Sequence, residues 1–305
     1  MLVEIKRSVC PYDCPDTCGL LVYVEDGVVK KVAGDPDHPF TRGTLCPKMN
    51  HYERTVHSST RLTRPLIRTG LKGKGEFRSV SWNEAVEYIT GRWRDIIARY
   101  GGEAIIPCSY AGTMGLVQRN CGHAFFHRLG ASRLERTICS PAKDVGWKIV
   151  MGDTPGLHHD EVLYSDLVIL WGINAAATSI HMLRGVYEAR KRGAEIWLID
   201  TYETHTARSA DRVFITRPGS DGALALGMMH VVVRDKLADE AFIGKYVQGF
   251  AELRDTVLPD YTPEAVGRII GLPAATIEEM ARAYGRAKAP FIRLGRVCPV
   301  MPTAP

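Results

Sequence analysis

The sequence predicts an α/β protein in which a small, cysteine-rich N-terminal domain with a β-hairpin precedes a doubly wound, mostly parallel sheet with helices on both faces. Three observations lead to this prediction. Cys10, Cys14, Cys18 and Cys46 gather near the N-terminus, two β-branched runs follow the first three cysteines, and apolar strands alternate with amphipathic helices from about residue 160. The 305 residues, 45% of them hydrophobic, suffice for one large domain or two to three smaller ones.

The charge balance argues against a nucleic-acid-binding protein. Lys and Arg number 39 against 34 Asp and Glu, which gives a net charge of only +5 without long runs of like charge. No stretch approaches the roughly 20 apolar residues that a bilayer crossing requires, so we expect no membrane span. The start, MLVEIKRSVC, has no apolar signal core and no twin-arginine pair, so we expect a cytoplasmic protein. In that reducing compartment, clustered cysteines indicate metal ligands or reactive thiols rather than disulfides.

The cysteine segment CPYDCPDTC spaces Cys10, Cys14 and Cys18 four residues apart, and the proline after each of the first two opposes a regular helix. The next segment, LLVYVEDGVVKKVAGD, predicts a hairpin that turns at residues 26–27 and leads the chain back, so Cys46 is a suitable fourth ligand. Four thiolates suit either a [4Fe-4S] cluster or a structural zinc ion. Zinc sites favour two pairs of closely spaced cysteines, whereas here three are local and one is remote. The spacing therefore favours the iron–sulfur cluster over zinc.

Further elements are predicted in order along the chain. The capping-box pattern from Ser81 to Glu84 and the apolar spacing behind it predict a helix over residues 82–100, and AIIP from Ala104 predicts a short strand. The segments DLVILW, EIWLID and RVFI predict strands of a parallel sheet. Helices are expected between and after them over about residues 179–192 and 223–233, with a short helical stretch at ETHTARSA.

Polar residues follow the predicted strands of the sheet, where ligands of such sheets gather. An acidic residue that closes a strand, such as Asp200, can accept hydrogen bonds from ribose hydroxyls. Glycine and backbone amides at a helix start, as in the turn over residues 219–222, can hold phosphate. No GxGxxG pattern follows a strand, which disfavours an ordinary NAD site.

The cysteine segment, the remote LCPK and the downstream RLTRPLIRTGLKGKGEFRSVSWNEAV resemble the opening of the molybdopterin oxidoreductase family. That family includes formate dehydrogenases, periplasmic nitrate reductases and thiosulfate or polysulfide reductases. The resemblance implies a [4Fe-4S] cluster in the first domain and places Lys48 between cluster and pterin. In order, WGINAA, LIDTYETHTARSAD and RPGSDGAL resemble the three family segments that hold the guanosine and pyrophosphate of molybdopterin guanine dinucleotide. The implied cofactor contacts are Gly172, Asn174, Asp200, Thr201, Pro218, Gly219, Ser220 and Asp221.

The segment RTICSPAKDVGW resembles the place where the family carries its protein ligand to molybdenum or tungsten. The resemblance implies that Cys139 is this ligand, and Ser140 is its rival because some members use a serine oxygen. Formate dehydrogenases of the family have a histidine directly after the metal-bound residue. This sequence has Ser140 there, which disfavours formate oxidation.

The resemblance implies a molybdopterin-dependent oxidoreductase that performs two-electron redox chemistry, or oxygen or sulfur transfer, on a small-molecule substrate. Electrons would leave past Lys48 through the cluster to an electron-transfer protein partner. Family members run far past 305 residues, so we expect a truncated chain whose missing C-terminal domain a separate chain would have to supply. The alternatives are a non-catalytic iron–sulfur electron-transfer or assembly subunit, an inactive fragment and a zinc-stabilised binding module.

Four domains are expected on this interpretation. They are a [4Fe-4S] cluster domain over residues 1–62, a partial α/β domain over 63–135, a Rossmann-like molybdopterin-dinucleotide-binding domain over 136–290, and the truncated end of the family fold over 291–305.

Overall fold

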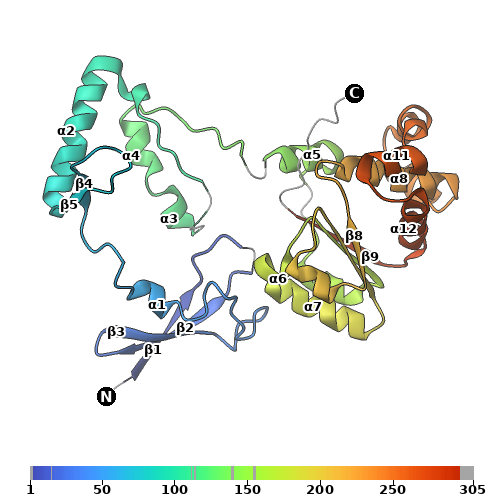
Figure 1. Cartoon of the computed structure of the whole chain (residues 1–305), viewed down its shortest axis with the longest axis horizontal. Coiled ribbons are helices and arrows are strands. Elements are labelled where there is room, and N and C mark those ends of the chain that lie inside the picture. Colours follow the sequence, from blue (N-terminus) through green and yellow to red (C-terminus); the bar gives the residue numbers. More distant parts are fainter. Residues whose placement is uncertain are drawn as a thin grey trace. The chain divides into compact units, whose positions relative to one another are not determined.

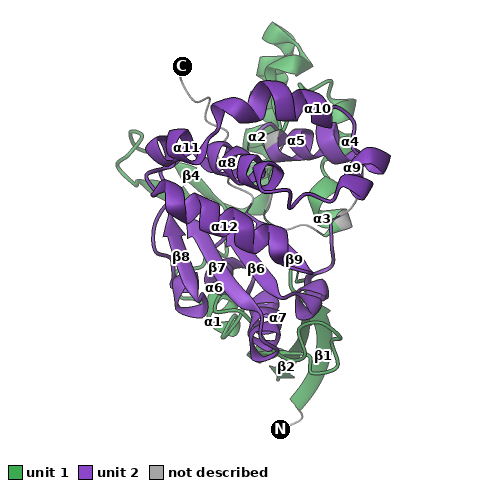
Figure 2. Ribbon diagram, turned by 90° about the vertical axis from the view of Figure 1, so that its right-hand side faces the viewer, with its two compact units in different colours: residues 1–136 green, residues 137–305 purple. Residues whose placement is uncertain are grey.

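A computed structural model describes residues 3–14, 16–110, 112, 115–138, 141–153 and 156–295. The chain divides into two compact units, residues 1–136 and 137–305, which Figure 2 shows in different colours. Cys139 and Ser140, the predicted metal ligand and its rival, lie outside the described residues.

Unit 1 (residues 1–136) begins with a three-stranded antiparallel sheet in the order β1-β2-β3. Its strands are β1 (Val3–Val9), β2 (Gly19–Glu25) and β3 (Val28–Gly34). The turn between β2 and β3 lies at Asp26 and Gly27, whose φ angles are 49° and 75°. Positive φ at both central positions is typical of the tight hairpin turn that matches strand twist. The predicted hairpin is confirmed, whereas β1 was not predicted.

One long helix and several short elements make up the rest of unit 1. Ser81 caps α2 (Trp82–Tyr100) because its hydroxyl accepts a hydrogen bond from the N–H of Glu84 at 3.1 Å. The predicted N-cap at Ser81 and the predicted helix over residues 82–100 are thereby confirmed. The other elements, visible in Figure 1, are α1 (Glu53–Val56), the antiparallel pair β4 (Leu66–Arg68) and β5 (Phe77–Ser79), α3 (Leu116–Asn120) and α4 (His123–Arg128).

The strand predicted from Ala104 is wrong. Ala104, where the strand was expected to begin, is the last residue of a short 3₁₀ helix, Gly102–Ala104. Residues 105–110 after it form no regular secondary structure. The carbonyl of Ile105 accepts a hydrogen bond from the N–H of Ser132 at 2.9 Å. A strand needs a ladder of such bonds, and the described residues provide no neighbouring strand there to supply it.

Unit 2 (residues 137–305) is built on a four-stranded parallel sheet in the order β8-β7-β6-β9. The strands are β6 (Leu167–Trp171), β7 (Glu195–Asp200), β8 (Arg212–Ile215) and β9 (Pro290–Leu294). The chain moves outward from β6 through β7 to β8 and then returns to β9 on the other side of β6. This reversal of strand order creates a topological switch point beside β6.

Helices cover both faces of this sheet, as the doubly wound prediction requires. One face packs against α8 (Asp221–Arg234), α11 (Pro263–Ile270) and α12 (Ala274–Arg286), and the other packs mainly against α7 (Ile180–Lys191). Alternate residues of β6 point to opposite faces, with Ile169 in the first core and Leu170 in the second. The predicted α/β class is confirmed.

The remaining elements of unit 2 are shorter. They are α5 (Pro141–Met151), α6 (Ala175–Thr178), α9 (Glu240–Tyr246), α10 (Phe250–Glu252), the 3₁₀ helices His159–Tyr164, His205–Ser209 and Leu258–Asp260, and a π-helical turn at Leu253–Val257. None of the helices in the described part of the chain combines the length and the apolar composition needed to cross a membrane.

Two arginines and two carboxylates tie the end of α8 to α12. Asp235 accepts hydrogen bonds from Nε of Arg234 at 2.8 Å and from Nε of Arg282 at 2.7 Å. Glu278 lies 2.8 Å from Nη1 of Arg234 and accepts from Nη1 of Arg282 at 3.2 Å. The hydrogen bonds from Arg234 and Arg282 lower the pKa of Asp235 to about 2.

We predict that Asp235→Asn destabilises unit 2 in a pH-dependent way. A carboxyl with a lowered pKa stabilises the fold above its unfolded-state pKa, about 3.9, and this contribution is lost as the pH falls through the folded-state value. The difference in free energy of unfolding between wild type and variant, measured by urea denaturation, should be largest near neutral pH and fall by about half at pH 3. Asp260→Asn, which removes an exposed carboxylate of the same unit, is the control. A difference for Asp235→Asn that stays constant from pH 7 to pH 3 would contradict the assignment.

Candidate functional site

The loop that joins β1 to β2 carries three of the four predicted cluster ligands. The N–H of Cys10 donates to the carbonyl of Cys18 at 2.9 Å, which extends the strand pairing by one step and sets both cysteines at the base of the loop. Two backbone N–H groups of the loop, those of Tyr12 and Asp16, act on the Cys10 and Cys14 thiols respectively and lower the pKa of each against the larger effect of burial. N–H donors to sulfur are one of the means by which proteins tune iron–sulfur clusters.

The fourth predicted ligand reaches this loop through a shared apolar core. The carbonyl of Cys46 accepts hydrogen bonds from the N–H groups of Met49 and Asn50, both at 3.0 Å, so the chain turns directly after the cysteine. The side chain of Met49 is 1% exposed and packs with Leu20 and Val32 in a core that Cys10 and Cys46 also contact. The structure therefore brings the remote cysteine to the local three.

The electrostatics of the thiols show that all four lie within range of one another. Burial, together with the smaller effects of the neighbouring Cys10, Cys14 and Cys46, raises the pKa of the Cys18 thiol to about 12. Burial also raises the pKa of Cys10 and of Cys14, while the ammonium group of Lys48 lowers both. Lys48 thus lies beside the predicted cluster site, as the position two residues after Cys46 implies.

The donor chemistry of this loop fits an iron–sulfur cluster. The six cysteines in the described part of the chain, these four among them, are free thiols. Among the described residues, no three His, Cys, Asp or Glu side chains are close enough together to hold a metal ion as they stand. The four thiols therefore lie near one another but do not yet point at a common centre. An iron–sulfur cluster requires soft sulfur donors, nearby backbone amides and a setting that is partly shielded from solvent, and this loop provides all three.

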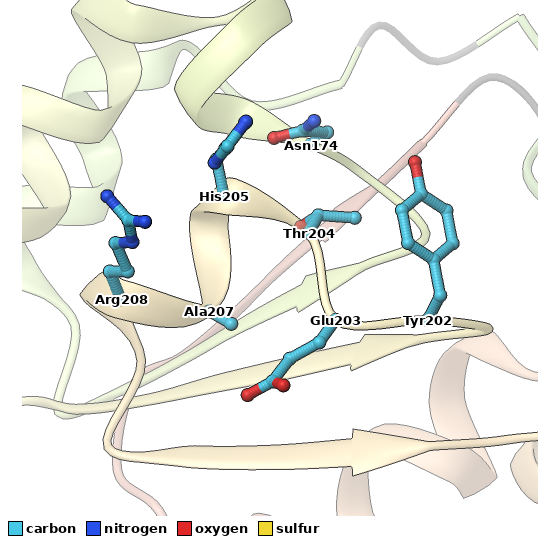
Figure 3. A pocket seen from close by; sticks show the side chains of 7 residues that line it. All are labelled: Asn174, Tyr202, Glu203, Thr204, His205, Ala207 and Arg208. Carbon is cyan, nitrogen blue, oxygen red and sulfur yellow. The ribbon is translucent and has the colours of Figure 1, made fainter.

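A second polar site lies at the carboxyl edge of the parallel sheet in unit 2. A cavity of about 680 Å³ opens between the segment that follows β6 and the segment that follows β7, as Figure 3 shows. Such a volume falls in the usual range for small-molecule sites. The side chains that line it are Asn174, Tyr202, Glu203, Thr204, His205, Ala207 and Arg208.

Asn174 and the neighbouring threonines shape this cavity. The hydroxyl of Thr206 donates to Oδ1 of Asn174 at 2.9 Å and accepts from the N–H of Ala176 at 3.1 Å, which fixes the amide. Thr204 is 7% exposed, and its hydroxyl oxygen is buried without a hydrogen-bond partner in the described part of the chain. Buried polar groups are rarely left unpaired, so this hydroxyl indicates a place for a ligand.

The turn before α8 was also predicted to contact the cofactor. Its two polar side chains instead make hydrogen bonds within the protein. The hydroxyl of Ser220 donates to the carbonyl of Arg217 at 2.6 Å, and the carboxylate of Asp221 accepts from Nε1 of Trp171 at 2.6 Å. No described residue accepts from the backbone N–H groups of residues 219–221. Those amides stand at a helix N-terminus and suit a phosphate group.

The remaining predicted contacts follow the same edge. Gly172 has a φ of 61°, and a side chain on Gly295 would collide with the carbonyl of Gly172, so the ends of β6 and β9 approach each other as only glycine allows. Asp200 accepts from the N–H of Thr201 at 2.8 Å. Pro218 and Gly219 lie in the turn after β8, where Gly219 has a φ of 78°. Of the predicted contacts, Asn174 is the one that lines the cavity.

Comparison with known proteins matches the two successive parts of the chain, which contain the two sites, to one family. Residues 61–296 match the model described as molybdopterin oxidoreductase, and residues 3–58 match the molybdopterin oxidoreductase Fe4S4 domain. The chain belongs to the molybdopterin oxidoreductase family. Members of this family bind molybdopterin guanine dinucleotide with molybdenum or tungsten.

Individual relatives are similar over nearly all of this chain but over less than half of their own length. The probable oxidoreductase YoaE of Bacillus subtilis is 44% identical over 292 residues, which are 95% of this chain and 43% of that protein. The F420-dependent formate dehydrogenase 2 subunit alpha of Methanococcus maripaludis is 30% identical over 93% of this chain and 41% of its own. The structure of acetylene hydratase from Pelobacter acetylenicus has the same fold over 95% of this chain and 40% of that one, with a TM-score of 0.76 at 23% identity.

The sequence predicted the segment after β7 as a site but not the individual residues by which this family member lines the cavity. Tyr202, Glu203, Thr204, His205 and Arg208 were not singled out. Their signal was present, because a dense run of polar side chains directly follows the carboxyl end of a buried strand.

We predict that Thr206→Val, but not Thr204→Val, destabilises the chain. Thr204→Val removes a buried hydroxyl that has no partner, so the free energy of unfolding should stay unchanged or rise by about 1 kcal/mol in the ligand-free chain. Thr206→Val is the matched control, because it removes a hydroxyl that makes two hydrogen bonds and should cost about 1 to 3 kcal/mol. Urea denaturation measures both, and equal losses of stability would mean that Thr204 has a partner within the fold.

Proposed function

We propose that this chain forms the cluster-bearing and dinucleotide-binding part of a molybdopterin-dependent oxidoreductase that carries out two-electron redox chemistry, or oxygen or sulfur transfer, on a small molecule. The observation that supports this most strongly is the joint presence of a thiol cluster with Lys48 beside it and a ligand-sized polar cavity at the carboxyl edge of the parallel sheet. When bound, the metal–pterin group supplies two-electron exchange with substrate and the iron–sulfur cluster supplies one-electron transfer.

The residues of the chain have separate roles in this proposal. Cys10, Cys14, Cys18 and Cys46 hold the cluster, and the ammonium of Lys48 stabilises negative charge at the sulfur atoms. In unit 2, the fixed amide of Asn174 and the hydroxyl of Thr204 orient the dinucleotide in the cavity. The free backbone amides of the turn before α8 and the polar ends of β6 and β7 add contacts to it. Cys139, with Ser140 as the rival, is the proposed protein ligand to the metal.

The assembly that uses these sites is also part of the proposal. An electron-transfer protein receives electrons from the cluster, and residues beyond those of this chain complete the substrate site, because the relatives are more than twice as long as the segment they share with it. We place the protein in the cytoplasm, where four free thiols persist without forming disulfides.

We predict that Cys46→Ser abolishes cluster binding whereas Cys121→Ser does not. Cys46 is one of the four gathered thiols, while Cys121 is an exposed cysteine of unit 1 outside that group. Chain produced anaerobically should contain about four iron atoms and show the broad visible absorbance of a [4Fe-4S] centre, and both should be lost only in Cys46→Ser.

The same preparation separates the proposal from its alternatives. Molybdenum or tungsten together with pterin fluorescence supports the oxidoreductase. Iron without molybdenum, tungsten or pterin would favour a non-catalytic electron-transfer or assembly subunit. A colourless, zinc-containing protein would overturn the cluster assignment.

We predict that Lys48→Gln lowers the reduction potential of the cluster by tens of millivolts. The charge of Lys48 acts on the Cys10 and Cys14 thiols, and a nearby positive charge favours uptake of an electron. A redox titration followed by electron paramagnetic resonance measures the shift. Lys30→Gln, which removes an exposed lysine from β3 of the same unit, is the control and should leave the potential unchanged. Equal shifts in the two variants would mean that Lys48 has no special position.

A further inference from the structure

A small cavity in unit 1 has a wall of basic side chains that neither cofactor site uses. Its volume is about 190 Å³, and it lies between α4 and the chain that follows it. His123, His127, Arg133 and Arg136 supply its polar wall, and Phe126 and Leu134 supply apolar contacts. None of these residues is a predicted cluster ligand or dinucleotide contact.

The helix geometry of α4 directs two imidazoles into this cavity. His123 and His127 stand four residues apart, so they lie on one face of the helix, and their ring centroids are 6.2 Å apart. The side chain of Phe126 packs against Trp93 of α2, with ring centroids 5.9 Å apart, and helps to anchor the helix that carries both rings.

Arg136 is held in place at the wall of the cavity. Its Nε donates to the carbonyl of Ser109 at 2.9 Å, and its Nη2 donates to the hydroxyl of Ser109 at 2.8 Å. Nη2 also lies 3.3 Å from Nε2 of His123. A guanidinium carries only donors, so Nε2 of His123 accepts this bond and the other ring nitrogen, Nδ1, is left to carry a proton. The Nη1 group of Arg136 has no partner among the described residues.

Among the described residues, no counter-charge lines the cavity. Its lining contains no carboxylate, and Arg133 makes no hydrogen bond or ion pair with any residue of the described part of the chain. Two guanidinium groups that share one small wall repel each other unless an anion lies between them. Arginine donors are also well matched in geometry to the oxygens of phosphate-type anions.

We propose that this cavity is a binding site for one tetrahedral oxyanion, either a free phosphate or sulfate ion or the phosphoryl group of a small metabolite. Its volume of about 190 Å³ lies below the usual range for sites that enclose a whole small molecule, and it suits one compact oxyanion. Histidines four residues apart on a helix also occur in metal sites. Here the guanidinium of Arg136 occupies Nε2 of His123 and repels a cation, so the anion is favoured.

Calorimetric titration of inorganic phosphate and sulfate into the full chain tests this site. Arg133→Gln should weaken binding about tenfold, because it removes a charged donor from the wall. Arg128→Gln is the matched control: it removes another exposed arginine, from the last turn of α4, that does not line the cavity, and binding should stay within about twofold of wild type. Equal weakening by the two variants, or no binding of either ion by wild type in the millimolar range, would overturn the proposal.

Two further measurements make the outcome specific. Phosphate should shift the imidazole resonances of His123 and His127 together, and His127→Gln should reduce affinity in the same direction as Arg133→Gln. Shifts confined to other histidines would overturn the site. Competition by glycerol phosphate would assign it to the phosphoryl group of a metabolite, and exclusion of glycerol phosphate would assign it to the free ion.

Discussion

Parallel pairing of β6 along both of its edges is the constraint on which the rest of unit 2 depends. The strand pairs with β7 on one side and β9 on the other, and all of its residues are buried. A strand buried on both faces must be apolar throughout, and the run from Leu167 to Trp171 meets this requirement. Because the neighbours run parallel to it, the segments that leave the strands at their carboxyl ends meet along one edge. The cavity at Asn174 and the turn before α8 both follow from this pairing.

Trp171, the last residue of β6, belongs both to the apolar core and to a hydrogen bond with the next polar segment. The indole of Trp171 belongs to the core, yet its N–H binds Asp221 and so ties the end of the strand to the start of α8. The side chains of the turn before α8 thus stabilise the fold, while the backbone N–H groups of the same turn remain available to a ligand. The cysteine loop of unit 1 follows the same principle, because the buried side chain of Met49 belongs to the apolar core against which Cys10 and Cys46 pack. Each site is a short polar segment fixed by a core residue directly beside it.

The sequence predicted the elements that are determined by residues close together in the chain. It did not predict those that depend on pairing or packing with a distant segment. The cap at Ser81, the turn at Asp26 and the buried strands of unit 2 have their signals within a few residues, and the structure confirms them. β1 was missed because it is exposed along its whole length and owes its extended form to pairing with β2. The segment after Ala104 has strand-forming residues but no neighbour to pair with. The same limit applies to the site: the loop after β7 was recognisable, whereas the buried, unpaired hydroxyl of Thr204 depends on packing.

The two cavities differ in size and in charge. Each of these differences indicates that the two cavities suit different ligands. The larger one combines the carboxylate of Glu203 with the guanidinium of Arg208 and the amide of Asn174. This mixture of donors and acceptors matches a dinucleotide, which carries anionic phosphates beside neutral sugar and base groups. The smaller one offers charged and neutral donors without a carboxylate, and it has room for only one compact group. A dinucleotide cannot enter the smaller cavity, and a single oxyanion would leave most of the larger one to water, so volume and charge balance lead independently to the same division.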